Sequence, residues 1–129
     1  MCICYDSGNF IKAKALWSNP ACATDIGEAL GLSHAIHWMQ ELQLTNMDFE
    51  LDAKKVVDYC NGGHNDIFEF GAIIDQCKRC CFSYFENSKV EFSRRQTNGV
   101  AHTLAREVTF LTSPCIFNDV PLCIETLIF

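Results

Sequence analysis

The chain has no run of about 18 uncharged apolar residues, the length that a helix needs to span a bilayer, and this excludes a transmembrane protein. It also has no basic leader. The opening Met1-Cys2-Ile3-Cys4-Tyr5 reaches Asp6 too early to contain the apolar region of a signal peptide. We therefore expect a protein that works inside the cell, in a compartment that the sequence does not specify.

The sequence has no surplus of basic residues. Ten Lys and Arg stand against sixteen Asp and Glu, which gives a net charge of −6 and no general attraction to a polyanion. Any binding of nucleic acid must therefore be local or assisted by a metal. The densest basic group is Lys89, Arg94 and Arg95, and such groups are more often a solvated surface than a binding site.

The cysteines lack the even count and the spacing of a disulfide framework. There are nine of them in 129 residues, which favours free and mostly buried thiols in a reducing compartment. Internal repeats, low-complexity segments and linkers are also absent. The length fits a single domain with an ordinary core.

In the stretch from Met47 to Asp58, the spacing of the apolar residues changes in the middle. Apolar and acidic residues alternate up to Asp52, as in a half-buried strand. The spacing then becomes helical, with Lys54 and Asp58 four residues apart on a solvated face and Gly62-Gly63 at the end. Asp52 would thus lie at the carboxyl end of a strand, the edge where open α/β sheets place their chemistry.

The segments before this stretch predict a hairpin and a helix. Met1–Tyr5 and Phe10–Trp17 are β-prone and enclose the turn residues 6–9. Thr24 and Asp25 can cap a helix that ends near Leu44. Its apolar stripe consists of Ile26, Ala29, Leu32, Ile36 and Met39.

The segments after it predict a long helix, a strand and a last helix. Asp66 and Glu69 resemble a capping box at the start of a helix that ends near Phe85. The apolar stripe of this helix consists of Ile67, Phe70, Ile74, Cys77, Cys81 and Tyr84. Residues 89–93 are expected to form a short strand and residues 98–111 a helix. Residues 113–129 are expected to form an apolar tail that packs against the domain or a partner. The order predicts an α/β layered domain, residues 1–112, with a mixed sheet.

Three residues could meet at the carboxyl edge of this sheet: Glu28 from the first helix, Asp52 from the central strand and His102 from the last helix. Clustered carboxylates repel one another unless a divalent cation neutralises them, so the cluster implies Mg²⁺ or Mn²⁺. Paired ions serve the cleavage of phosphodiesters. For Glu28 alone, the simpler explanation is that a helix dipole favours a carboxylate near the amino terminus.

Three blocks of the chain, residues 27–32, 49–57 and 95–105, resemble the plant ribonuclease H-like domain related to retroelement reverse transcriptases. They occur in the order and at the spacing of that family, and the resemblance covers nearly the whole chain. It implies a five-stranded mixed sheet flanked by helices. It also implies metal-dependent cleavage of the RNA strand in an RNA–DNA hybrid.

The resemblance also assigns roles to single residues. Glu28 would be the helix carboxylate, Asp52 the strand-end carboxylate and His102 the residue on the final helix, where many members have Asp; a histidine there can still bind metal or move protons. Together these three would hold Mg²⁺ or Mn²⁺. Arg95 and Asn98 match the loop before that helix, where they would contact phosphate, although Asn98 is more simply a helix cap.

The sequence departs from the family at the front, because Met1 begins about where the family has its second strand. The first strand, with its metal-binding aspartate, has no counterpart here. Asp6 matches the hairpin turn instead. The expectation is therefore a truncated domain that binds nucleic acid and cleaves it little or not at all.

Two other functions remain open. A zinc site could use Cys60, His64, Cys77, Cys80 and Cys81, although Cys77 and Cys81 lie on an apolar helical stripe where cysteine acts as a small hydrophobe. A cysteine nucleophile has no evident partner base. Alternatively, the same fold could be a non-catalytic module that docks a protein partner through its apolar tail and exposed sheet edge.

Overall fold

The computed structural model describes residues 1–5, 7, 9–15, 23–85, 87–93 and 115–118. The chain divides into two units, one formed by residues 1–19 with 95–129 and the other by residues 20–94, and each is considered by itself. Across the described ranges, no helix is both long and apolar enough to cross a membrane.

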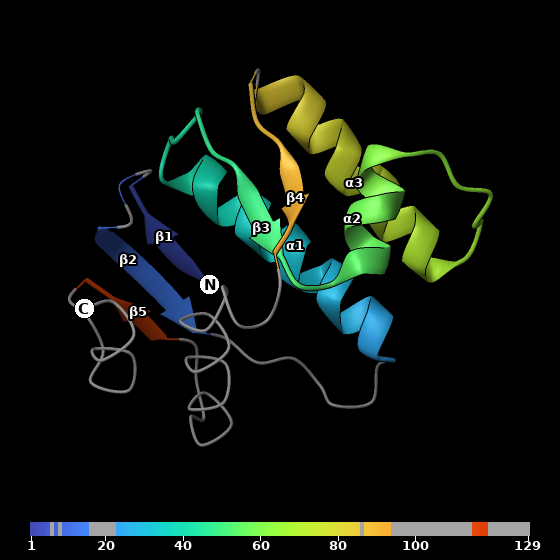
Figure 1. Cartoon of the computed structure of the whole chain (residues 1–129), viewed down its shortest axis with the longest axis horizontal. Helices are drawn as coiled ribbons and strands as arrows, with labels where there is room; N and C mark the ends of the chain where they lie inside the picture. The colour runs from blue at the N-terminus through green and yellow to red at the C-terminus, as the bar shows by residue number, and fades with distance from the viewer. Residues whose placement is uncertain (6, 8, 16–22, 86, 94–114, 119–129) are drawn as a thin grey trace. The chain divides into compact units, whose positions relative to one another are not determined.

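The described part of the first unit is a three-stranded antiparallel sheet. Its strands are β1 (Cys2–Cys4), β2 (Phe10–Ala15) and β5 (Cys115–Phe117), in the order β1-β2-β5 (Figure 1). The predicted hairpin is confirmed. The sequence analysis placed no strand in residues 113–129, yet β5 pairs with β2 there, with Lys14 opposite Ile116.

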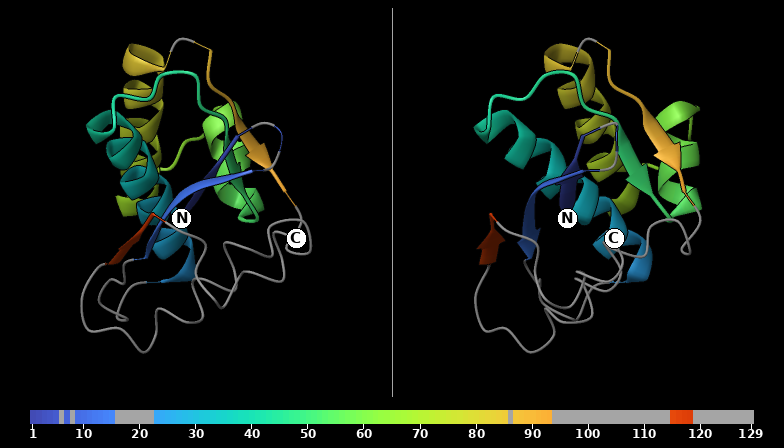
Figure 2. Two further views of the ribbon diagram at one scale, coloured as in Figure 1. Left: turned by 90° about the vertical axis from the view of Figure 1, so that its left-hand side faces the viewer. Right: turned by 60° about the vertical axis from the view of Figure 1, so that its left-hand side comes forward.

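The second unit contains three helices and two parallel strands. In chain order these are α1 (Thr24–Glu41), β3 (Phe49–Leu51), α2 (Lys54–Asn61), α3 (Glu69–Tyr84) and β4 (Val90–Phe92). Strand β3 pairs with β4, and α1 packs against α3. Figure 2 shows these two helices on the same side of the β3–β4 pair.

The core of the second unit lies between these helices and the strands. Leu32, Ile36, Val56 and Ile74 are almost completely buried. Ring contacts add to it, because Phe49 of β3 meets Phe85 edge to face at 5.5 Å. The predicted stripes of α1 and α3 are confirmed at most positions, but Ile67 precedes α3 and is 86% exposed, so its assignment to the stripe was wrong.

Both predicted helix caps were wrong. Ala23, not Thr24 or Asp25, is the cap residue of α1, and Phe68 is the cap residue of α3; neither helix has a side-chain cap. The Asp66 carboxylate instead accepts a hydrogen bond from the Phe68 amide at 2.9 Å, which makes a local turn before α3.

Helix α1 ends in a Schellman motif. The Leu44 amide donates to the Met39 carbonyl and the Gln43 amide to the Gln40 carbonyl, each at 3.0 Å. Gln43 has φ 57°, the left-handed conformation that normally selects glycine. The helix therefore ends at Glu41, a little before the predicted end near Leu44.

The predicted α/β class is confirmed, because the chain combines helices with strands that pair both antiparallel and parallel. The described strands form two sheets, β1-β2-β5 and β3-β4. The predicted helix of residues 98–111 lies outside the described residues. The boundary between domain and tail at residue 113 stays a prediction.

Candidate functional site

Asp52 follows directly on β3, at the carboxyl end of a parallel strand pair. The pairing sets Leu51 opposite Phe92, so Asp52 and Ser93 are the first residues beyond the two strands. The Ser93 amide donates to the Leu51 carbonyl at 2.8 Å and holds this edge together. Asp52 is half-buried. The sequence-based placement of Asp52 at a strand's carboxyl end is confirmed.

Glu28 lies in the second turn of α1 and faces this edge. The pKa of Glu28 is raised, first by partial burial and then by the negative charges of Asp52 and Asp25. The effect of Asp52 requires that α1 and the end of β3 bring the two carboxylates near each other. The structure thus joins two of the three residues expected to meet.

Lys55 of α2 forms an ion pair with Asp25 in the first turn of α1. Lys55 Nζ lies 2.6 Å from a carboxylate oxygen of Asp25 and 4.6 Å from the centre of the Phe70 ring. The hydrogen bond to Asp25 is the main reason why the pKa of Lys55 is raised. The pair ties the first turn of α1 to α2 and partly neutralises Asp25.

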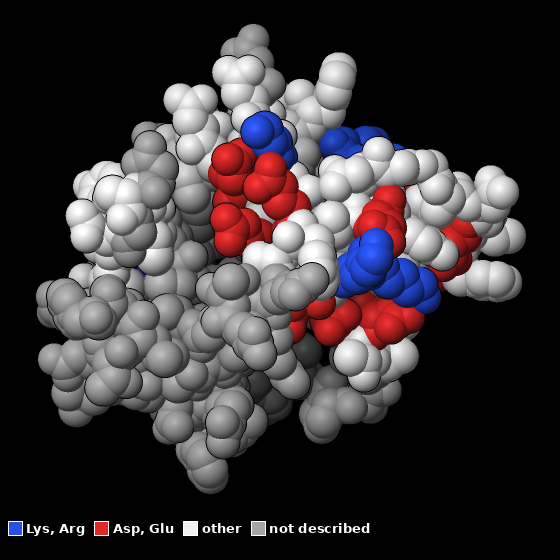
Figure 3. All heavy atoms as spheres, in the orientation of Figure 1, with Lys and Arg blue, Asp and Glu red and all other residues white. Residues whose placement is uncertain are grey.

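Acidic residues also occupy the open face of the β3–β4 pair. Glu50 and Glu91 are opposite each other in the register and both are exposed. Lys89 lies near them, with its Nζ 3.9 Å from Glu91. Figure 3 shows this acidic patch over the two strands and mixed charges over α2, where Lys54 pairs with Asp58 at 2.8 Å. A polyanion would be repelled by the strand face.

The remaining predicted site residues cannot be placed. His102, Arg95 and Asn98 lie outside the described residues, so their roles stay predictions. Among the residues that the structure describes, no group of three or more His, Cys, Asp or Glu side chains is arranged to hold a metal ion. The described part of the predicted site is therefore a pair of carboxylates, Glu28 and Asp52.

Sequence reasoning missed three residues near this pair: Asp25, Lys55 and Ser93. The Ser93 hydroxyl is buried and has no hydrogen-bond partner within the described ranges, which is costly unless another group satisfies it. Its position opposite Asp52 follows from the register of β3 and β4. The only signal in the sequence was that Ser93 follows a short strand, which does not by itself indicate a site.

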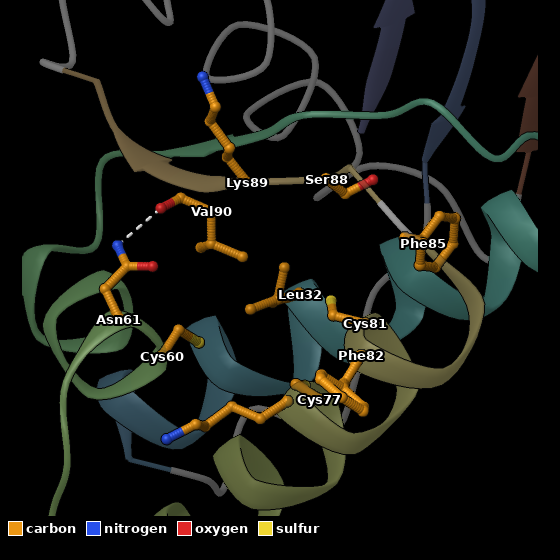
Figure 4. A pocket seen from close by; sticks show the side chains of 11 residues that line it. Leu32, Cys60, Asn61, Cys77, Cys81, Phe82, Phe85, Ser88, Lys89 and Val90 are labelled. Atoms are coloured by element: carbon orange, nitrogen blue, oxygen red, sulfur yellow. Dashed lines mark hydrogen bonds between the residues drawn. The ribbon is translucent and has the colours of Figure 1, made fainter.

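Three of the thiols considered for a zinc site, Cys60, Cys77 and Cys81, line a groove of about 610 Å³. Figure 4 shows Cys60 coming from α2, and Cys77 and Cys81 from α3, around Leu32 of α1. Burial raises the pKa of Cys60 and Cys81 to about 11 and that of Cys77 to about 12. These thiols are therefore protonated at neutral pH and act as small apolar side chains.

His64, the other member of that set, is held by different partners. Its Nδ1 accepts a hydrogen bond from the Asp66 amide at 3.1 Å, and its Nε2 lies 2.9 Å from Asp75 Oδ1. The ring stacks on Tyr59 with centroids 4.9 Å apart. These contacts give His64 a structural role in the segment between α2 and α3, and the described residues offer no support for zinc.

Helices packed beside a parallel strand pair, with two carboxylates at its carboxyl end, are features of an α/β domain with a site at the end of its strands. A family model described as "Reverse transcriptase-like" matches residues 1–108. The chain belongs to this family, which agrees with a ribonuclease H-like domain and with a function related to nucleic acids. Searches of the curated proteins and of the solved structures found no match.

Proposed function

We propose that this chain is a nucleic-acid-binding ribonuclease H-like domain that holds Mg²⁺ or Mn²⁺ between Glu28, Asp52 and a phosphate of the bound strand. One observation carries the proposal: partial burial and then the nearby charge of Asp52 raise the pKa of Glu28. A cation between two such carboxylates would favour the charged form of Glu28. Family membership supports nucleic acid as the partner.

The donor set fits such an ion. Mg²⁺ usually binds one or two carboxylates together with phosphate oxygens and water, and does not need a cage made only of protein. Glu28 and Asp52 supply hard oxygen donors of this kind, and their side chains remain partly open to solvent. When bound, the ion would neutralise both carboxylates and act as a Lewis acid at the phosphodiester.

The chain's own residues have separable tasks in this proposal. Asp52 and Glu28 accept hydrogen bonds from water and orient it at the carboxyl edge, and Lys55 restrains the neighbouring Asp25. Glu50 and Glu91 keep the polyanion off the strand face. His102 would bind metal or move protons, and Arg95 and Asn98 would contact phosphate, as the family resemblance implies.

The substrate that we propose is an RNA–DNA hybrid, and the reaction is hydrolysis of its RNA strand. Two-ion cleavage needs ligands for both ions, whereas the described residues provide only the Glu28 and Asp52 pair. We therefore propose that the domain binds a hybrid more readily than it cleaves it.

The first experiment measures Mn²⁺ binding and hybrid binding by the full chain. Glu28→Gln and Asp52→Asn should each weaken Mn²⁺ binding at least about tenfold, because each removes a ligand, and should abolish the Mn²⁺ dependence of hybrid binding. Asp58→Asn is the matched control, since Asp58 has the same charge but pairs with Lys54 on the exposed face of α2. Unchanged Mn²⁺ affinity in both site variants would overturn the proposed metal site.

A second experiment measures cleavage of a labelled hybrid in Mn²⁺. The chain as given is compared with the same chain preceded by a strand that carries an aspartate. Cleavage by the extended protein alone, lost in Asp52→Asn, supports the site and the impaired activity. No cleavage by a folded extended protein would count against the nuclease activity.

A protein-interaction role is the second candidate, and it rests on a different observation. Among the described strands, β3 pairs with β4 alone, so each of these strands has one edge without a neighbour. Open edges can accept a strand from another chain. Hybrid binding that is absent with and without Mn²⁺, in a folded protein, would favour this role.

A further inference from the structure

The strongest unassigned feature is the pair of thiols on β1. Cys2 and Cys4 are two residues apart on one strand and lie on the same face, whereas Ile3 points to the other face and is 4% exposed. Their sulfur atoms are 3.8 Å apart. The pair belongs to the first unit and shares no residue with the Glu28 and Asp52 site.

The strand geometry shows that the two side chains converge. Alternate residues of a regular strand are about 6.6 Å apart along the strand axis, so sulfurs at 3.8 Å must lean toward each other. The register also shifts at this point. Cys4 pairs with Phe10, and Ile11 of β2 is the extra residue without a partner on β1, so the bulge increases the local twist of the hairpin.

We propose that Cys2 and Cys4 form a two-thiolate chelate for a thiophilic d¹⁰ metal ion, Cu⁺ or Zn²⁺. A tetrahedral Zn²⁺ with bonds of about 2.3 Å to sulfur separates two thiolates by about 3.8 Å, which is the separation found here. Soft thiolates select these same ions. On binding, each thiol forms one bond to the metal and releases one proton, and no electrons are exchanged.

A disulfide is the main competing use of this pair, and the backbone disfavours it. A disulfide needs Cβ atoms about 3.5–4.5 Å apart and Cα atoms no more than about 6.8 Å apart. Residues two apart on a strand lie at the limit of the second range and outside the first. A metal ion bridges the two sulfurs at the distance they already have, without moving the backbone.

The pair is accessible to a metal ion. Cys4 is exposed and β1 is an edge strand of the described sheet, so an ion can reach the pair from solvent. No third ligand joins the pair within the described ranges. Two thiolates can hold Cu⁺ without further ligands, whereas water would complete the tetrahedron around Zn²⁺.

Metal titration of the full chain tests this proposal. Cu⁺ is titrated in competition with bicinchoninate under anaerobic, reducing conditions, and Zn²⁺ in competition with a chromophoric chelator. The C2S/C4S variant should bind one equivalent of Cu⁺ less than the wild type. The matched control is C60S/C81S, which removes two thiols from the second unit and should retain that equivalent.

Each outcome decides the matter. Equal binding of both ions by C2S/C4S and the wild type overturns the proposal, as does loss of the equivalent in C60S/C81S alone. Loss of Zn²⁺ binding without loss of Cu⁺ binding would identify Zn²⁺ as the ion. If C2S/C4S does not fold, Cys4→Ser is used instead, because Cys4 is exposed. With Cd²⁺ as the probe, Cys4→Ser should lose the thiolate-to-metal charge-transfer band that the wild type shows. An unchanged band would overturn the proposal.

Discussion

The pKa of Glu28, on α1, is raised by partial burial and then by the charge of Asp52 at the end of β3. Neither residue alone indicates a site, because a carboxylate in the early turns of a helix is favoured by the dipole and a carboxylate after a strand is common in turns. The contribution of Asp52 to the Glu28 shift indicates that the fold brings the two carboxylates near each other. Perturbed pKa values of this kind cluster at functional sites.

The first prediction concerns stability and pH. A carboxyl whose folded pKa is raised destabilises the folded state progressively as pH rises from its unfolded value of about 4.3. Glu28→Gln should therefore raise the melting temperature slightly at pH 7, and this gain should disappear as the pH falls to about 4. The effect is small because Glu28 is exposed and water screens its charge.

Thermal melts of the wild type and Glu28→Gln between pH 4 and 7 check this prediction. Asp52→Asn should lower the pKa of Glu28 toward its ordinary value, which an NMR titration of the Glu28 carboxyl would detect. A Glu28 pKa that does not change in Asp52→Asn would show that the two carboxylates do not interact.

The second prediction concerns the ion pair of Lys55 and Asp25. Lys55→Met removes the 2.6 Å contact with Asp25 and the cation–π contact with Phe70. We expect a lower melting temperature, with a larger fall than for Lys54→Met, which loses only an exposed pair within one helix. Because the Lys55 pKa is raised, its stabilisation is present at neutral pH and is lost only above about pH 10.

A double-mutant cycle with Asp25→Asn measures the coupling directly. The melting temperatures of both single variants and the double variant are compared at low and high salt. Additive effects at both salt concentrations would contradict a specific bond between Lys55 and Asp25.

The third prediction concerns the end of α1. Gln43 adopts φ 57°, a conformation that costs most residues about 1–2 kcal/mol but not glycine. Gln43→Gly should therefore stabilise the protein by about 0.5–1 kcal/mol, after the greater freedom of glycine in the unfolded chain is included. Urea unfolding measures the change.

Gln40→Gly is the matched control for this change. Gln40 lies inside α1, where glycine should cost about 1 kcal/mol. Stabilisation by Gln40→Gly, or destabilisation by Gln43→Gly, would contradict the Schellman ending.

The fourth prediction compares two isoleucines that sequence analysis placed on one stripe. Ile74 is 0% exposed and Ile67 is 86% exposed. Ile74→Ala should destabilise the protein by about 2–5 kcal/mol, because it leaves a cavity in the core. Ile67→Ala should change the stability by less than about 0.5 kcal/mol. Similar losses in both variants would mean that Ile67 is buried in solution.

Local patterns in the sequence were sufficient for the elements themselves. The alternation before Asp52 and the helical spacing after it predicted β3 and α2, and the four-residue spacing of Lys54 and Asp58 predicted a solvated face, on which the two form an ion pair. These features depend on residues close in the chain, so the period of apolar residues and the helix geometry determine them.

The caps of α1 and α3 show where local sequence patterns fail to predict the structure. Thr24 and Asp66 are good capping residues, yet neither is a cap, because α1 begins at Thr24 itself and α3 begins at Glu69. A capping side chain can instead stabilise a local turn. Asp66 forms such a turn with Phe68.

By itself, then, the sequence determined the α/β class, the order of most elements and the two carboxylates as candidates. Only the tertiary structure decided that Glu28 and Asp52 approach each other, that Ser93 lies opposite Asp52, and that β5 pairs with β2. These relations join residues far apart in the chain. They depend on how helices pack and strands pair, and no local periodicity encodes that packing.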